Sequence, residues 1–157
     1  MIVKDILDED YINYKKASMV ISFPRCSWKC EKECGQRACQ NSALAKAPDI
    51  EISVEKVIDR YLNNPITKAV VCGGLEPFDS WSDLLLFTKK FREKSQDDLI
   101  IYTGYEKSEI IDKINILKQF SNIVLKTGRY IPGHEKHYDE VLGVCLASNN
   151  QQAERIS

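Results

Sequence analysis

Four of the six cysteines lie within fourteen residues of one another, and this clustering is the strongest chemical signal in the sequence. They are Cys26, Cys30, Cys34 and Cys39, and a short apolar run at residues 19–23 leads directly into them. Thiolates packed this closely need a metal, a disulfide or a redox partner that neutralises them. The residues between them are largely charged, so the segment does not resemble a packed core. We call the segment from Cys26 to Cys39 the cysteine loop.

The spacing of these cysteines favours an iron–sulfur cluster. Structural zinc sites typically use two C-x-x-C pairs, whereas successive cysteines here are separated by three, three and four residues. The first ten residues are acidic and contain no long apolar segment, so we expect no signal peptide and a cytoplasmic location. Disulfides are rare in that compartment. Thiolates are the usual ligands of iron–sulfur clusters, and a cluster held by three cysteines leaves one iron open to a substrate or cofactor.

Composition limits the other possibilities. With 157 residues, of which 43% are hydrophobic, the chain is expected to form one domain over residues 1–157. Its 22 basic and 23 acidic side chains give no net positive field, so no nucleic-acid partner is expected. The apolar runs are far shorter than the roughly 20 residues of a membrane-spanning helix, so no membrane association is expected either.

Hydrophobic periodicity predicts strands that alternate with helices. Buried strands are expected at residues 19–23, 68–72, 99–102 and 122–125. Helices are expected at residues 5–15, 41–47, 54–62, 80–94 and 106–120. Ser53 is expected to cap the helix that follows it, and Ser80 with Asp83 forms a Ser-x-x-Asp capping box at the start of the next one.

This alternation predicts an α/β fold with a parallel sheet, in which functional loops gather at the carboxyl ends of the strands. Each predicted strand is followed by such a loop. The four loops are the cysteine loop, Gly73-Gly74, Thr103-Gly104 and Thr127-Gly128. We therefore expect all four to face a single cavity.

Two of these loops carry a family resemblance. Cys26-Ser-Trp-Lys-Cys30 is similar to the first pair of the C-x3-C-x2-C loop of radical S-adenosylmethionine (SAM) enzymes. Gly73-Gly74-Leu75-Glu76-Pro77 is similar to the Gly-Gly-Glu-Pro signature of the same enzymes, with Leu75 inserted. Within this superfamily, the chain resembles the activating proteins of anaerobic ribonucleotide reductase.

The later motifs resemble the same activating proteins and occur in the same order. The stretch 101–105 contains their Tyr-Thr-Gly-Tyr sequence, and residues 126–130 are similar to the end of their next strand. Residues 142–155 resemble their closing Gly-Ser-x-Asn-Gln segment. The resemblance therefore spans nearly the whole chain.

The third cluster ligand stays open between two cysteines. Cys39-Gln-Asn41 resembles the end of the family loop, which has Asn two residues after its last cysteine, and this slightly favours Cys39. The tighter spacing favours Cys34. The family also has an aromatic residue just before the last cysteine; neither alternative offers one here, and Trp28 is the candidate substitute.

The resemblance implies a single radical SAM-like domain over residues 1–157 that forms an open partial (β/α) barrel. It implies a [4Fe–4S] cluster and SAM as cofactors, with SAM cleaved to a 5′-deoxyadenosyl radical that installs a glycyl radical on a partner enzyme. The favoured partner is the large subunit of anaerobic ribonucleotide reductase. The electron would come from a donor such as flavodoxin or ferredoxin. The alternatives are a non-catalytic module that binds zinc or a cluster, and a radical SAM enzyme acting on a small molecule.

The resemblance also implies roles for individual residues. Gly73 and Gly74 would leave backbone groups free for the methionine part of SAM, and Glu76 would shape that turn or accept from the ammonium group. Thr103 and Gly104 would contact the ribose. Asn41 and Trp28 complete the candidate cofactor residues, and Asn149 and Gln151 are candidates for contact with cofactor or partner.

The remaining cysteines and the two histidines are expected to have no part in the site. Cys72 ends a predicted strand and Cys145 lies in an apolar run, so both are expected in the core. His134 and His137 lie in a Pro-Gly loop among charged residues and are expected to face solvent.

Overall fold

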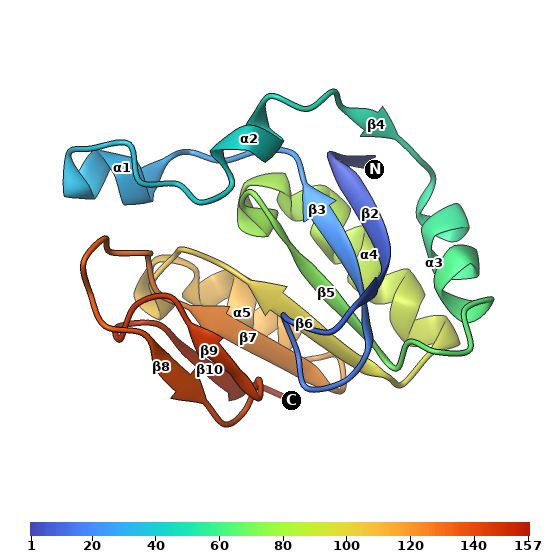
Figure 1. The fold of residues 1–157 in the computed structure, drawn as a ribbon. Coiled ribbons are helices and arrows are strands. Elements are labelled where there is room, and N and C mark those ends of the chain that lie inside the picture. The colour runs from blue at the N-terminus through green and yellow to red at the C-terminus, as the bar shows by residue number, and fades with distance from the viewer.

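A mixed six-stranded sheet forms the centre of the computed structural model, which describes residues 1–157 (Figure 1). Its strands are β2 (Asp5–Asp10), β3 (Ser18–Phe23), β5 (Ala69–Gly74), β6 (Asp98–Tyr102), β7 (Ile123–Thr127) and β10 (Gln152–Arg155). Their order across the sheet is β10-β7-β6-β5-β3-β2. The central four are parallel, and Val71 of β5 stands beside Val20 of β3 and Ile100 of β6. The α/β class and the four predicted strands are therefore confirmed.

The two outer strands differ from the all-parallel sheet that the sequence predicts. β2 runs antiparallel to β3, and β10 runs antiparallel to β7. β2 reaches β3 through a short run of bends at residues 11–16, without the helical crossover that a parallel neighbour requires. β2 and β10 lie at opposite edges of the sheet and do not pair, so the sheet is open and no closed barrel forms.

Helices cover one face of the sheet. α3 (Val54–Leu62), α4 (Trp81–Lys94) and α5 (Ile111–Leu117) pack there, and their apolar side chains join those of the strands in a core cluster of 22 buried residues (Figure 1). The Ser53 hydroxyl accepts the Lys56 N–H at 3.3 Å, so the predicted cap of α3 is confirmed.

The opposite face of the sheet is only partly covered. A second cluster of seven buried residues joins the alternate strand residues of that face to Tyr14, Leu142 and Leu146. Leu146 belongs to the antiparallel hairpin of β8 (His137–Asp139) and β9 (Val144–Leu146). Toward the carboxyl ends of the strands this cover opens into a cavity, which Val20 and Tyr102 line.

The remaining elements are short. They are β1 (Ile2–Val3), which pairs antiparallel with β4 (Ile50–Glu51), the helices α1 (Lys29–Cys34) and α2 (Ser42–Ala45), and the 3-10 turns η1 (Pro77–Ser80) and η2 (Lys107–Glu109). α1 and α2 belong to the connection that leaves β3 and extends beyond the ends of the strands (Figure 1). None of the helices combines the length and the hydropathy that crossing a membrane requires.

Two predicted helices are wrong in whole or in part. The segment 5–15 forms β2 and bends, because Ile6 is buried between exposed Asp5 and Leu7, an alternation that suits an edge strand. The helix predicted at 106–120 is divided into η2 and α5, with a break at Ile110. A capping box of Glu106 with Glu109 begins η2.

The capping box predicted at Ser80 is also wrong. The buried Ser80 hydroxyl has no hydrogen-bond partner. Asp83 instead accepts the N–H of Ile2 at 3.1 Å, so its carboxylate fixes the N-terminal strand rather than the start of α4.

Candidate functional site

A cavity of about 350 Å³ lies where the loops after the four parallel strands meet. Its volume is within the range of about 300–1,000 Å³ that small-molecule sites usually occupy. The predicted site residues that line it are Cys26, Cys30, Cys39, Asn41, Gly73, Gly74, Glu76, Thr103 and Gly104. Cys34, Trp28 and Asn149 are the predicted residues that do not line it.

Three of the four clustered cysteines line the cavity, and the fourth, Cys34, does not. The Cys34 thiol lies 3.4 Å from the carbonyl oxygen of Gln36, on a helix that has no buried residue. Burial raises the pKa of the Cys26 thiol to about 11, and it also raises the pKa of Cys39. These two thiols are therefore protonated at neutral pH, and binding of a metal there would release protons.

The three thiols share a cavity but do not form a complete metal site. No three His, Cys, Asp or Glu side chains are grouped closely enough to hold a metal ion. Three thiols from one loop are nevertheless the donor type that iron–sulfur clusters take, so the residues fit such a group. Because α1 buries no side chain, the loop can draw its sulfurs together with little loss of packing.

Trp28 holds the first turn of the cysteine loop in an unusual conformation. Its φ of 58° is left-handed, which is uncommon for a bulky residue and costs about 1–3 kcal/mol. Its N–H donates to the Cys26 sulfur at 3.3 Å. Trp28 therefore shapes the backbone between Cys26 and Cys30, whereas its side chain lies outside the cavity lining.

After α1, two polar side chains hold the last part of the cysteine loop against the cavity. One oxygen of the Glu31 carboxylate accepts the N–H groups of Ala38 and Cys39, each at 3.1 Å. The Asn41 amide donates to the carbonyl oxygen of Gly74 at 2.5 Å. The residues inserted between Cys30 and Cys39 are thus closed into a loop whose far end is tied to the glycine turn.

The glycine turn after β5 packs directly on β3. Gly74 has φ 81°, and a Cβ there would lie 2.7 Å from the Cα of Ser22, so only glycine fits. The N–H of Leu75 donates to Phe23 O at 3.2 Å, and that of Glu76 donates to Arg25 O at 2.8 Å. These bonds hold the turn against the start of the cysteine loop.

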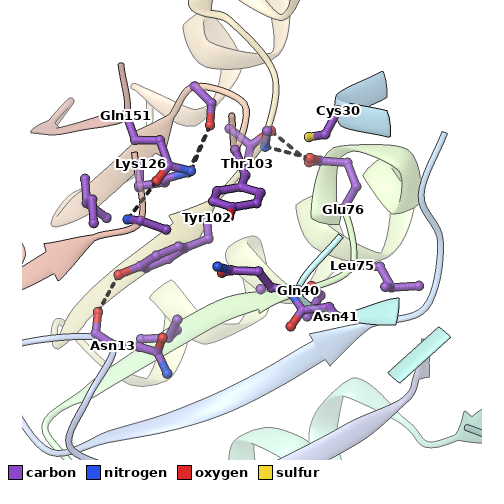
Figure 2. A pocket seen from close by; sticks show the side chains of 18 of the residues that line it. Asn13, Cys30, Gln40, Asn41, Leu75, Glu76, Tyr102, Thr103, Lys126 and Gln151 are labelled. Carbon is purple, nitrogen blue, oxygen red and sulfur yellow. Dashed lines mark hydrogen bonds between the residues drawn. The ribbon is translucent and has the colours of Figure 1, made fainter. Parts of the chain in front are cut away.

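Glu76 joins the loops after β5 and β6. Its carboxylate accepts from the Thr103 hydroxyl at 2.8 Å and from the Gly104 N–H at 2.9 Å (Figure 2). It also accepts from the Phe78 N–H at 3.1 Å. Burial raises its pKa to about 7, and the donated hydrogen bonds act in the opposite direction. Glu76 thus holds the two loops together, because each of its oxygens already accepts a hydrogen bond from the protein.

Thr103 and Gly104 are fixed by the same contacts. Besides donating to Glu76, the Thr103 hydroxyl accepts the N–H of Tyr105 at 3.0 Å. A Cβ on Gly104 would lie 3.2 Å from the Cys30 sulfur, so glycine at this position leaves room for that thiol. The loop after β6 therefore shapes the space beside Cys30.

Asp79 ties the start of the cysteine loop to this arrangement. It accepts the Ser27 N–H at 2.6 Å and the Tyr105 hydroxyl at 2.5 Å. Burial, followed by the bond to Asp79, raises the pKa of Tyr105 to about 12, so its hydroxyl stays protonated and continues to donate.

Arg129 anchors α1 from the other side. Its guanidinium lies 2.7 Å from Glu109 and 2.9 Å from Glu33 of α1, the latter without hydrogen-bond geometry at Nε. Lys29 of α1 also pairs with Glu109 at 2.7 Å. The carboxylates are partly exposed, so each pair contributes only about 0–1 kcal/mol, but together they orient the helix that carries Cys30.

Two lining residues, Lys126 and Tyr102, lie outside the predicted set and point into the cavity from the strand ends (Figure 2). The predicted residue Gln151 also lines the cavity, and its side-chain oxygen accepts the N–H groups of Ala147 and Ser148. Cys145 is exposed and lines the cavity, so the prediction that it is a core cysteine is wrong; the neighbouring Leu146 takes the inward position. Cys72 is fully buried, as predicted.

The histidine pair stays away from the cavity lining. His134 is exposed and its Nδ1 shares a hydrogen bond of 2.9 Å with Asn149, while His137 is half-buried at the start of β8. These two residues add no ligand to the cysteine loop.

The comparison with known families agrees with the cysteine chemistry. The family described as "4Fe-4S single cluster domain" matches residues 17–153, which include the cysteine loop and the four parallel strands β3, β5, β6 and β7. No curated protein and no solved structure shows a significant match to the chain. The length of the family match shows that this chain belongs to the 4Fe-4S single cluster domain family.

Proposed function

We propose that the protein is a radical SAM enzyme, a [4Fe–4S]-dependent activase that installs a glycyl radical on a partner enzyme. The observation that carries the proposal is the convergence of three thiols from one loop and the Gly-Gly turn on a single cavity. The ordered motifs that resemble the activases of anaerobic ribonucleotide reductase give the reaction type. An open sheet with helices on one face and the cavity on the other is compatible with a partial barrel.

In this proposal Cys26, Cys30 and Cys39 hold the cluster, and Cys34 does not. The three line the cavity, and the hydrogen bond from the Cys39 N–H to the Glu31 carboxylate holds Cys39 there. Three thiolate ligands leave one iron free for the methionine amino and carboxylate groups of SAM. When bound, the cluster and SAM supply a one-electron cleavage that yields the 5′-deoxyadenosyl radical.

The protein's own residues would orient the ligand and shape its surroundings. Gly73 and Gly74 lie at the cavity wall without side chains, so backbone groups are available to the methionine part. Glu76 and Thr103 act as positioning residues, because their polar atoms are committed to each other and to the loop after β6. Gly104 offers a flat wall beside Cys30 for the ribose.

The partner is proposed to be a glycyl-radical enzyme, and by resemblance the large subunit of anaerobic ribonucleotide reductase. The cavity is lined by β9 on one side and by Cys30 of α1 on another, and α1 has no buried residue. An approaching loop of a protein can enter such a site. A flavodoxin or a ferredoxin is the proposed electron donor.

Anaerobic reconstitution tests the proposal. The protein is loaded with iron and sulfide without oxygen, reduced, and given SAM. We expect about four irons per chain and release of 5′-deoxyadenosine. Stoichiometric zinc without sulfide would instead identify the alternative binding module. A loaded cluster without SAM cleavage would leave an iron–sulfur protein and end the radical proposal.

A further inference from the structure

Lys126 occupies a position where lysine is unusual. In β7 it follows Val124 by two residues, so both side chains project from the face of the sheet that the helices do not cover. Lys126 is 5% exposed and lines the cavity, on the side opposite Cys30 and Glu76 (Figure 2). A charged side chain is therefore buried at the wall of the candidate site.

No carboxylate forms an ion pair with this charge. No carboxylate oxygen lies within 4.0 Å of the Lys126 nitrogen. Its one hydrogen bond goes to the carbonyl oxygen of Gly128 at 3.0 Å. Burial lowers its pKa to about 8, so the ammonium form still predominates at neutral pH. The Tyr102 ring centroid lies 6.0 Å from the same nitrogen, but a ring accepts no ordinary hydrogen bond and carries no charge. Two of the three donors therefore have no hydrogen-bond acceptor in the protein, and a buried ammonium without an ion-pair partner is costly.

A purely structural role does not explain this lysine. The Gly128 carbonyl that it contacts also accepts from the Gln151 amide at 3.3 Å, so this acceptor is satisfied without Lys126. The N–H of Gly128 is likewise bonded, to Tyr105 O at 3.1 Å. An apolar side chain would fill the same position without a buried charge.

We propose that Lys126 is the anion-binding residue of this cavity and receives the carboxylate of its small-molecule ligand. The inference rests on the proposed function, in which that carboxylate is the one on the methionine part of SAM. A carboxylate placed at Lys126 supplies the missing counter-charge and accepts the unused donors, as charge-assisted hydrogen bonds.

The test compares SAM with its decarboxylated analogue, which lacks only the carboxylate. Binding of each is measured by calorimetry on the anaerobically loaded protein, for the wild type, for Lys126→Met and for Lys113→Met. Lys113 is the matched control, because its nitrogen also donates to a backbone carbonyl at 3.0 Å, that of Phe78, but it lies outside the cavity lining. The unfolding temperature of the unloaded protein is measured for the same three proteins.

We expect the wild type and Lys113→Met to prefer SAM over the analogue by about 10- to 100-fold. In Lys126→Met we expect this preference to fall by about tenfold, and the part that remains comes from the carboxylate's contact with the open iron. We also expect Lys126→Met to unfold at the same temperature as the wild type or higher. A preference in Lys126→Met as large as in the wild type would overturn the inference and leave the proposed function intact. A wild type that binds neither compound would overturn both. A strongly lowered unfolding temperature with an unchanged preference would show that Lys126 is structural.

Discussion

The Glu31 carboxylate accepts the backbone N–H of Cys39 at 3.1 Å, and this bond connects the two ends of the segment inserted into the cysteine loop. The same oxygen accepts from Ala38. Glu31 thus returns the chain to the cavity after α1, so that Cys39, rather than the nearer Cys34, stands beside Cys26 and Cys30.

Replacing Glu31 with Ala is expected to loosen the cluster without unfolding the sheet. Two hydrogen bonds to a carboxylate are lost, so we expect a chelator to remove iron from the loaded protein about tenfold faster or more. Lys32→Ala, an exposed neighbour on α1, is the control and should retain the wild-type rate. Equal rates in all three proteins would show that Glu31 does not position Cys39.

Replacing Glu76 with Gln tests its role as the link between two loops. Glu76 presents one oxygen to Phe78 and the other to Gly104, and both of these partners are N–H donors. An amide has only one oxygen, so one buried donor would face an NH₂ group, and we expect a loss of about 1–3 kcal/mol in the free energy of unfolding.

Urea denaturation measures this loss. Glu55→Gln, at an exposed carboxylate that pairs with Lys90, is the control and should change the free energy of unfolding by no more than about 0.5 kcal/mol. A Glu76→Gln protein as stable as this control would mean that the loops do not depend on both carboxylate oxygens.

Replacing Gly74 with Ala separates backbone strain from a steric clash. Gly74 and Gly35 are both left-handed, with φ of 81° and 70°, but only a Cβ on Gly74 would meet backbone atoms of Ser22. Gly35→Ala should therefore cost about 1 kcal/mol, and Gly74→Ala clearly more, because β3 and the glycine turn would have to separate. Equal losses in thermal or urea unfolding would argue against this close approach.

The buried Lys126 predicts a specific pH dependence of stability. Its folded pKa, about 8, is lower than its unfolded value, so the unfolded chain binds more protons between about pH 8 and pH 10.5. The cost of burying the charge is therefore complete below pH 8 and disappears as pH rises. Glu76, Cys30 and Glu106 are the nearby groups that oppose the lowered pKa.

The stability difference between Lys126→Met and the wild type isolates this effect from other titrating groups. We expect the variant's advantage to be largest near pH 7 and to shrink by up to roughly 3 kcal/mol by pH 10.5. Unfolding titrations at several pH values measure it. A difference that stays constant across this range would mean that Lys126 titrates normally in the folded protein.

The sequence was sufficient to predict the central strands and the loops that follow them. The runs at 19–23, 68–72, 99–102 and 122–125 are largely apolar and each ends in a turn or loop, so pattern and tertiary structure agree. Their shared carboxyl edge then follows from parallel pairing. The same pairing brings the loops after these strands to one cavity.

The edges of the sheet could not be predicted in the same way. β2 has the sequence Asp-Ile-Leu-Asp-Glu-Asp, in which charge obscures the alternation of an edge strand. β8, β9 and β10 are three or four residues long, and their pairing depends on contacts with distant segments. Single-sequence periodicity contains little of that information.

The residues of the site that were not predicted are only weakly marked in the amino-acid sequence. Lys126 is a charged residue that directly follows three apolar residues of a predicted strand, and that contrast was the available sign of a special role. Glu31 is one of several charged residues in the cysteine loop, and nothing in its type distinguishes it from Glu33. Only the fold shows that Glu31 turns back to Cys39.

In the proposed function, three cysteines hold a four-iron cluster and leave one iron free. Mössbauer spectroscopy of the loaded Cys34→Ser protein, compared with Cys39→Ser, measures this. We predict that Cys34→Ser keeps four irons, one of which changes its signal when SAM is added, and that Cys39→Ser fails to keep the intact cluster. A cluster that survives in Cys39→Ser but is lost in Cys34→Ser, or irons that are all unaffected by SAM, would contradict the account.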